Sequence, residues 1–103
     1  MIAVVHHPGY VLPAPHSANP KANKNALIRD ALVASGAALE WVEPDAMPRA
    51  WLEAVHCPDY VAEVIEARVP AAKERRIGFP VTPPGAWRSQ LVPGGTFRAA
   101  LEA

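Results

Sequence analysis

The fold of this chain is decided by residues 2–42, which read IAVVHHPGYVLPAPHSANPKANKNALIRDALVASGAALEWV. The apolar, β-branched run at the start of this stretch predicts a short buried strand over residues 2–6. Apolar residues at helical spacing predict a helix over 23–35, which stops at a Ser-Gly pair. The run ALEWV predicts a second strand over 38–42. A strand, a helix and a strand in this order predict a parallel pair and an α/β fold.

Three further helices are expected after the second strand. Prolines that suit a first helical turn open the predicted helices 48–55 and 58–67, and two glycines precede a predicted helix over 95–102. Residues 71–84 contain three prolines and a glycine, and we expect them to form a long surface loop. The proline-rich residues 7–24 predict a second long loop.

Composition and charge narrow the class of protein. The 103 residues contain 10 Lys and Arg against 10 Asp and Glu, and half of the chain is hydrophobic. We therefore expect one globular domain over residues 1–103, with neither nucleic acid nor a membrane surface as a partner. The start of the chain has no signal-peptide pattern, and Cys57 is the single cysteine. Both observations favour the cytoplasm.

The residues by themselves do not predict an active site. Four histidines are present, but their spacing does not match a zinc motif. His6 and His7 are adjacent at a strand end, so their side chains should point to opposite faces. Cys57 precedes a helix without a recognisable catalytic partner in sequence. We therefore expect no catalytic residue and no metal ligand in this chain.

Three stretches together resemble the N-terminal portion of the histone deacetylase family, which comprises zinc-dependent amidohydrolases and includes acetoin-utilisation proteins. The stretches are VVHHPGYVLPAPHSANPKANKNALIRDAL, WLEAVHCPDYVAEVI and RRIGFPVTPPGAWRSQLVPGGTFRAALEA. Their order and spacing agree with the family over essentially the whole chain. The proline-rich loop ends in a lysine and lacks a common HPE motif, which is similar to a bacterial branch near the class IV deacetylases.

The resemblance implies the first part of a three-layer arginase/deacetylase-type fold. It implies that the family's paired histidines, zinc ligands and late tyrosine lie beyond Ala103, so that zinc belongs to the full-length domain and this chain alone is inactive. His16 and Lys24 resemble the wall of the acyl-lysine tunnel, and Gly78, Phe79 and Pro80 resemble its rim. Residues 68–84 contain no Asp, so the rim carboxylate of some relatives is absent.

Under this interpretation, we expect the missing C-terminal part of the domain to complete the chain. Two alternatives stay open. In the first, the chain associates with itself and is a non-catalytic binding or oligomerisation module. The remaining alternative is a complete small α/β protein of another family. It would bind a ligand at the carboxyl ends of its strands, with Glu43 and Asp45 beside His7.

Overall fold

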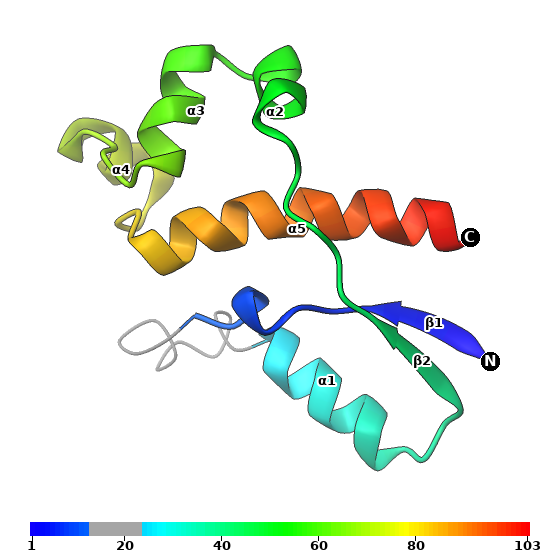
Figure 1. Ribbon diagram of the computed structural model, residues 1–103. Coiled ribbons are helices and arrows are strands. Elements are labelled where there is room, and N and C mark those ends of the chain that lie inside the picture. The colour runs from blue at the N-terminus through cyan, green and yellow to red at the C-terminus, as the bar shows by residue number, and fades with distance from the viewer. Residues whose placement is uncertain (13–23) are drawn as a thin grey trace.

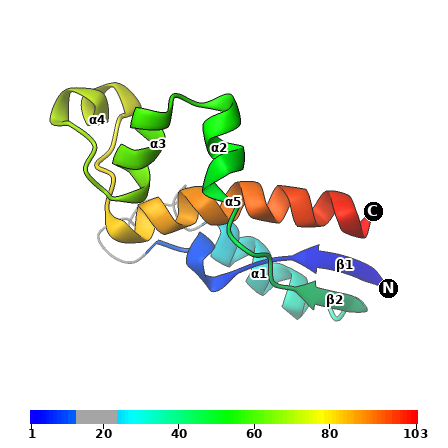
Figure 2. The same cartoon turned by 45° about the horizontal axis from the view of Figure 1, so that its top comes forward.

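The computed structural model describes residues 1–12 and 24–103 (Figure 1). Two short strands lie beside a long C-terminal helix, and a group of shorter helices covers the other side of that helix (Figures 1 and 2). The elements in chain order are β1 (Ile2–Val5), the 3-10 helix η1 (Pro8–Tyr10), α1 (Lys24–Ala34), β2 (Leu39–Val42), α2 (Arg49–Val55), α3 (Pro58–Ile65), α4 (Ala71–Ile77) and α5 (Pro83–Glu102).

The parallel strand pair expected from the sequence is confirmed. β1 and β2 form a two-stranded parallel sheet in which Ile2 lies opposite Leu39 and Val5 opposite Val42. The ladder is extended at its end by a hydrogen bond from the His6 N–H to the Val42 carbonyl oxygen, at 2.9 Å. The described part of the chain therefore has the α/β character that the strand, helix and strand pattern predicts.

The core is small and is organised along α5. This helix packs against β1 and η1 on one side and against α3 on the other. Its residues Ala86 and Leu91 are buried, as are Tyr10, Val61 and Val69 elsewhere in the described chain. The two halves of the described structure therefore depend on α5 for their contact with each other.

The predicted final helix is longer than expected, since it begins at Pro83 and not at residue 95. The hydroxyl oxygen of Thr82 accepts a hydrogen bond from the Gly85 N–H at 3.3 Å and so caps the first turn. The two prolines after Thr82 suit this turn, because the first helical N–H groups have no intrahelical acceptor. The expected loop over residues 71–84 is therefore wrong at its C-terminal end.

The same expected loop also contains α4. Its helix ends at Gly78, which has a positive φ of 98° and whose N–H bonds to the Glu74 carbonyl oxygen. The Glu74 carboxylate also accepts from the Val81 N–H at 2.6 Å, which orders the turn toward α5. Lys73 bonds to Glu63 of α3 at 2.5 Å. The later prolines favour a loop. Residues that favour a helix, the glycine that ends it and these side-chain bonds outweigh that tendency.

Pro93 lies inside α5 without ending it. A proline at this position cannot donate a backbone hydrogen bond to the preceding turn. An N–H at position 93 would donate to the carbonyl oxygen of Ser89. The carbonyl oxygen of the next residue, Gln90, accepts a hydrogen bond from the Met47 N–H at 2.9 Å. The segment after β2 is thereby tied directly to the middle of α5.

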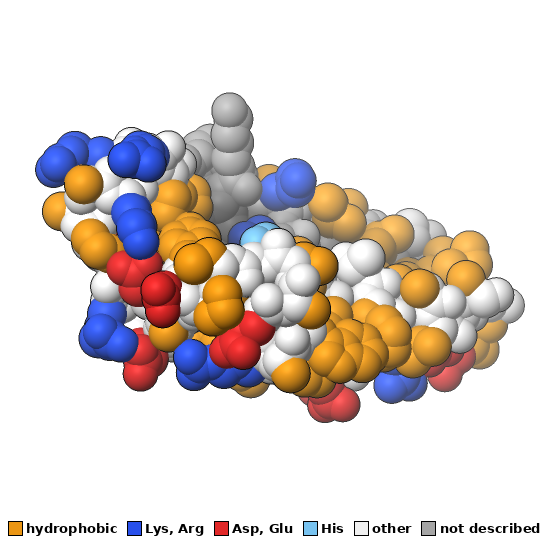
Figure 3. Space-filling model, turned by 90° about the horizontal axis from the view of Figure 1, so that it is seen from above, with side chains coloured by type: hydrophobic (Ala, Val, Ile, Leu, Met, Phe, Trp, Pro, Cys, Tyr) orange, Lys and Arg blue, Asp and Glu red, His pale blue; other side chains and the backbone are white. Residues whose placement is uncertain are grey.

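Many large apolar side chains stay exposed. The surface of α1 shows this most clearly, because none of its residues is buried and Leu27 is 63% exposed. Trp51 of α2 packs edge to face on Phe97 of α5, yet both rings remain substantially exposed. Figure 3 shows apolar side chains over much of the visible face toward the C-terminal end of α5. So much apolar surface is typical of a face that other polypeptide covers.

We predict that Thr82→Ala lowers the free energy of unfolding by about 1 kcal/mol, because it removes the cap of α5. The matched control is Thr96→Ala, since the Thr96 hydroxyl bonds to the Val92 carbonyl oxygen within the helix. Thr96→Ala should leave stability nearly unchanged, because alanine favours a helix interior. Urea denaturation followed by circular dichroism measures both. A loss at Thr96 and none at Thr82 would instead support a helix that starts near residue 95.

Candidate functional site

The residues that the resemblance singles out are not gathered into one site by the described structure. His16 lies outside the described residues. Lys24 is exposed at the first position of α1, while Gly78, Phe79 and Pro80 form the exposed turn after α4. Figure 1 places α1 and α4 on opposite sides of α5. Their proposed roles as tunnel wall and rim stay predictions.

Several aromatic rings pack around the two histidines at the carboxyl end of β1. The His6 ring packs edge to face on Tyr10 and on Trp41, with ring centroids 5.5 Å and 6.1 Å away. The His7 ring instead faces Trp87, at 6.3 Å. The adjacent histidines thus have different aromatic neighbours, which agrees with the expectation that they point to opposite sides of the strand.

The two histidines differ in their hydrogen bonds. Nδ1 of His7 accepts from the Gly9 N–H at 2.9 Å, so this ring caps η1 and has a structural role. The Nε2 atom of His6 is buried and has no hydrogen-bond partner among the described residues. Burial lowers the pKa of His6, and the nearby charge of Arg29 lowers it further, against an opposing effect of Glu43. The structure therefore favours the neutral form of His6.

Tyr10 connects this end of the sheet to α5. Its backbone carbonyl oxygen accepts from Nε of Arg88 at 2.9 Å, and burial raises the pKa of its phenol. A methyl group at Gly95 would overlap the Tyr10 hydroxyl. At Gly94 a methyl group would overlap the carbonyl oxygen of Asp45. The pair of glycines therefore allows a backbone approach that any larger residue would prevent.

The ligand site expected from Glu43 and Asp45 beside His7 stays a prediction. Asp45 is exposed, and its backbone carbonyl oxygen lies against Gly94 of α5. Glu43 is also exposed, and its charge acts on His6. In residues 1–12 and 24–103 no group of three or more His, Cys, Asp or Glu side chains is arranged to hold a metal ion.

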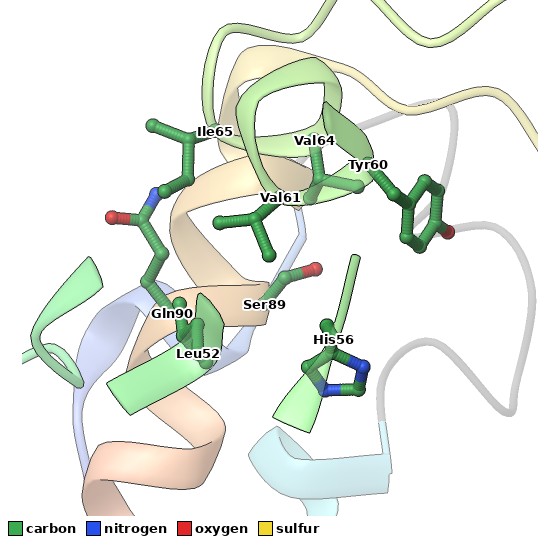
Figure 4. A pocket seen from close by; sticks show the side chains of 8 residues that line it. All are labelled: Leu52, His56, Tyr60, Val61, Val64, Ile65, Ser89 and Gln90. Carbon is green, nitrogen blue, oxygen red and sulfur yellow. The ribbon is translucent and has the colours of Figure 1, made fainter. Parts of the chain in front are cut away.

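A cavity of about 190 Å³ lies between α2, α3 and α5 (Figure 4). Four of its eight lining residues are aliphatic, and the other four are His56, Tyr60, Ser89 and Gln90. The hydroxyl of Ser89 donates to the Gly85 carbonyl oxygen, and the side-chain amide of Gln90 donates to the Ala86 carbonyl oxygen. These two polar groups therefore serve the helix rather than the cavity.

The sequence did not predict this cavity. It predicted helices over 48–55 and 58–67, but it began the last helix at residue 95, after Ser89 and Gln90. A period of 3.6 in the apolar residues of 83–93 would have been the signal, but prolines and glycines obscured it. Within the described residues, no helix has the length and apolar character needed to cross a bilayer.

Sequence comparison relates this chain to one part of a longer protein. No protein-family model matches. A protein of Picosynechococcus sp. whose name states that it is uncharacterised is 34% identical over 99 residues, which make up 94% of this chain and 33% of that protein. This chain is similar to part of a longer protein. It spans about a third of the curated relative it matches.

We predict that Gly94→Ala and Gly95→Ala each lower the free energy of unfolding by about 1–3 kcal/mol, the usual range for overpacking. The matched control is Gly85→Ala in the first turn of α5, where an added methyl group would meet only the Thr82 hydroxyl at 3.4 Å. Its stability should stay within about 0.5 kcal/mol of wild type. Chemical denaturation of the three variants tests this. Equal effects at all three positions would show that helix propensity, and not close packing, governs them.

A second prediction concerns pH and His6. Because the folded pKa of His6 lies below its ordinary value of 6.5, the unfolded chain binds more protons once the pH falls below that value. The free energy of unfolding should therefore decrease as the pH is lowered through 6.5 toward the folded pKa. A His6→Gln variant should lose this component. Denaturation midpoints between about pH 7.5 and 5.5 measure it, and equal slopes in both proteins would contradict the assignment to His6.

Proposed function

We propose that this chain forms the N-terminal part of a histone deacetylase-like zinc amidohydrolase domain, which hydrolyses acetyl-lysine or a related acylated amine only when the domain is complete. The contact of Gly95 with Tyr10 supports this proposal most directly. These residues belong to the third and first of the stretches that resemble the family. Two stretches that carry the resemblance and are distant in sequence therefore lie in contact.

The incomplete burial of the structure supports the same proposal. A sheet of two strands and a helix such as α1 without a buried residue leave apolar surface for further polypeptide to cover. The Picosynechococcus protein, of which the chain spans 33%, is long enough to supply such polypeptide. The arginase/deacetylase-type three-layer arrangement belongs to this proposal.

The chemistry would be divided between this chain and the remainder of the domain. A zinc ion bound by residues outside this chain would activate water and polarise the acyl carbonyl. The resemblance would give this chain part of the substrate-binding surface, with His16 and Lys24 in the tunnel wall and Gly78, Phe79 and Pro80 at the rim. Phe79, which is 58% exposed, offers apolar contact area there. The described structure holds Lys24 and the turn of Gly78 to Pro80 on opposite sides of α5, so these two parts would contribute separately.

The test compares this chain with the longer Picosynechococcus protein. We predict that the longer protein binds about one zinc ion per chain, releases acetate from an acetyl-lysine peptide and loses this activity when a chelator removes the metal. This chain, purified in the same way, should do neither. Metal analysis and acetate release measure the two properties. A zinc-free and inactive longer protein would overturn the proposal.

The exposed apolar surface also favours a second candidate, a non-catalytic binding or oligomerisation module. Light scattering coupled to size exclusion separates the two on this chain. A single defined dimer that is stable on dilution would support the module. A mixture of aggregates would support a part of a larger domain, and a well-behaved monomer would support a complete small protein.

A further inference from the structure

The cavity between α2, α3 and α5 has the size of a small-molecule binding site (Figure 4). Its volume of about 190 Å³ exceeds the roughly 150 Å³ of an engineered apolar cavity that binds benzene. Two of its lining residues, His56 and Ser89, are exposed, so the cavity opens to solvent. A molecule with a single ring and one small substituent can therefore enter the cavity and fit there.

The aliphatic lining residues provide an apolar surface for such a molecule. Val61 of α3 is only 5% exposed. The other three are half-buried, and they are Leu52, Val64 and Ile65. Figure 4 shows Leu52, Val61 and Ile65 on the side of the cavity away from the Tyr60 ring. Apolar surface of a ligand that lies against these side chains is removed from water, which favours binding.

Two ring-bearing residues of the lining are held in place by their neighbours. The backbone N–H of His56 donates to the Leu52 carbonyl oxygen at 2.9 Å, and α3 begins two residues later, which fixes the His56 backbone between two helices. Nζ of Lys73 lies 5.8 Å from the centroid of the Tyr60 ring and is bonded to the Glu63 carboxylate. This cation–π contact stabilises the position of the Tyr60 ring, so a ligand meets a largely preformed wall.

The hydrogen-bonding groups of the lining indicate the chemistry of the ligand. The hydroxyl of Ser89 and the side-chain amide of Gln90 already donate within α5. The His56 ring has no hydrogen-bond partner among the described residues, and an imidazole has at least one N–H to donate in either protonation state. No Asp, Glu, Lys or Arg of the described chain lines the cavity, so an ionised ligand would lose hydration without forming an ion pair. The cavity therefore favours a neutral ligand with an oxygen that accepts from His56.

We infer that the cavity between α2, α3 and α5 binds a small neutral carbonyl compound. The apolar ring of the ligand lies against the aliphatic side chains, and its carbonyl oxygen accepts a hydrogen bond from His56. A carbonyl suits this position because it accepts a hydrogen bond without bringing a hydrogen that needs an acceptor of its own. None of the proposed tunnel and rim residues lines this cavity within the described structure, and the inference rests on no part of the proposed function.

Titration with acetophenone, followed by NMR of this chain, tests the inference. Acetophenone carries one ring and one carbonyl group and has no charge. We expect saturable shifts of the backbone amides of Tyr60, Val64 and Ser89, with a dissociation constant of about 1 mM or below. Benzoate, which has the same ring but is ionised at neutral pH, should cause no saturable shift at these residues. Absent shifts with acetophenone, or equal affinities for the two compounds, would overturn the inference.

Variants at two polar lining positions test the role of His56. His56→Phe keeps a ring of similar shape but removes the N–H, so it should weaken acetophenone binding about 2- to 10-fold, the usual value of one net hydrogen bond. Toluene, which lacks the carbonyl, should bind this variant and the wild type alike. The matched control is Ser89→Ala, which should change neither affinity, because the Ser89 hydroxyl donates within α5. An equal loss of both compounds in His56→Phe would overturn the hydrogen bond to the carbonyl.

A second pair of variants locates the binding site. Val64→Phe places a larger side chain in the cavity and should abolish saturable acetophenone shifts. Val33→Phe adds the same ring on α1, where Val33 is 63% exposed, and should preserve them. Retained binding in Val64→Phe would overturn the inference.

Two other outcomes identify a different site or occupant. A second cavity, of about 320 Å³, lies beside Trp51 and Phe97 and is also lined by Asp45 and Arg98. Acetophenone shifts confined to this second cavity would overturn the inference. If a higher concentration of the chain displaces acetophenone from Tyr60, Val64 and Ser89, the occupant is a second copy, which also overturns it. None of these results depends on acetate release, so the inference and the proposed function can fail separately.

Discussion

The structure depends on the close approach of α5 to the backbone at the carboxyl ends of the two strands. Gly94 lies against Asp45 and Gly95 against Tyr10, at separations that leave no room for a side chain. A hydrogen bond from the Met47 N–H to the Gln90 carbonyl oxygen fixes the same contact. Because α5 also carries α3 on its other side, this approach sets the position of the strands relative to the helical group.

Apart from the close contact of α5 with the segments that follow β1 and β2, the described structure has only a small hydrophobic core. The buried apolar residues are few, and Leu91 is the largest side chain that is almost completely buried. The outer faces of α1, β1 and α2 stay open. Hydrophobic burial increases steeply with the number of layers that a sheet and its helices form. The proposed function follows from this imbalance between the close packing at α5 and the exposed apolar surface around it.

The polar groups near the strand ends serve the architecture. His7 caps η1, Arg88 binds the Tyr10 carbonyl oxygen, and the half-buried ring of His6 packs on Tyr10 and Trp41. These groups shape the end of a parallel sheet, where α/β proteins generally place their ligands. In the proposed domain, reactive groups would come from outside this chain. These residues would then stabilise the carboxyl end of the sheet, next to which such groups would lie.

Helices and strands that depend on short-range sequence patterns could be predicted from the sequence alone. β1, β2, α1, α2 and α3 were predicted to within a few residues because apolar spacing and helix-terminating residues report directly on such segments. It also indicated that His6 and His7 diverge. Only the tertiary structure decided that residues 83–94 are helical and that α4 precedes them. There, the Thr82 cap, the Glu74 hydrogen bond and the close contacts of Gly94 with the Asp45 backbone and of Gly95 with the Tyr10 side chain outweigh the local tendency of Pro and Gly to break a helix. The partners of the two glycines lie far away in sequence, and the prolines and glycines obscure the apolar period of residues 83–93.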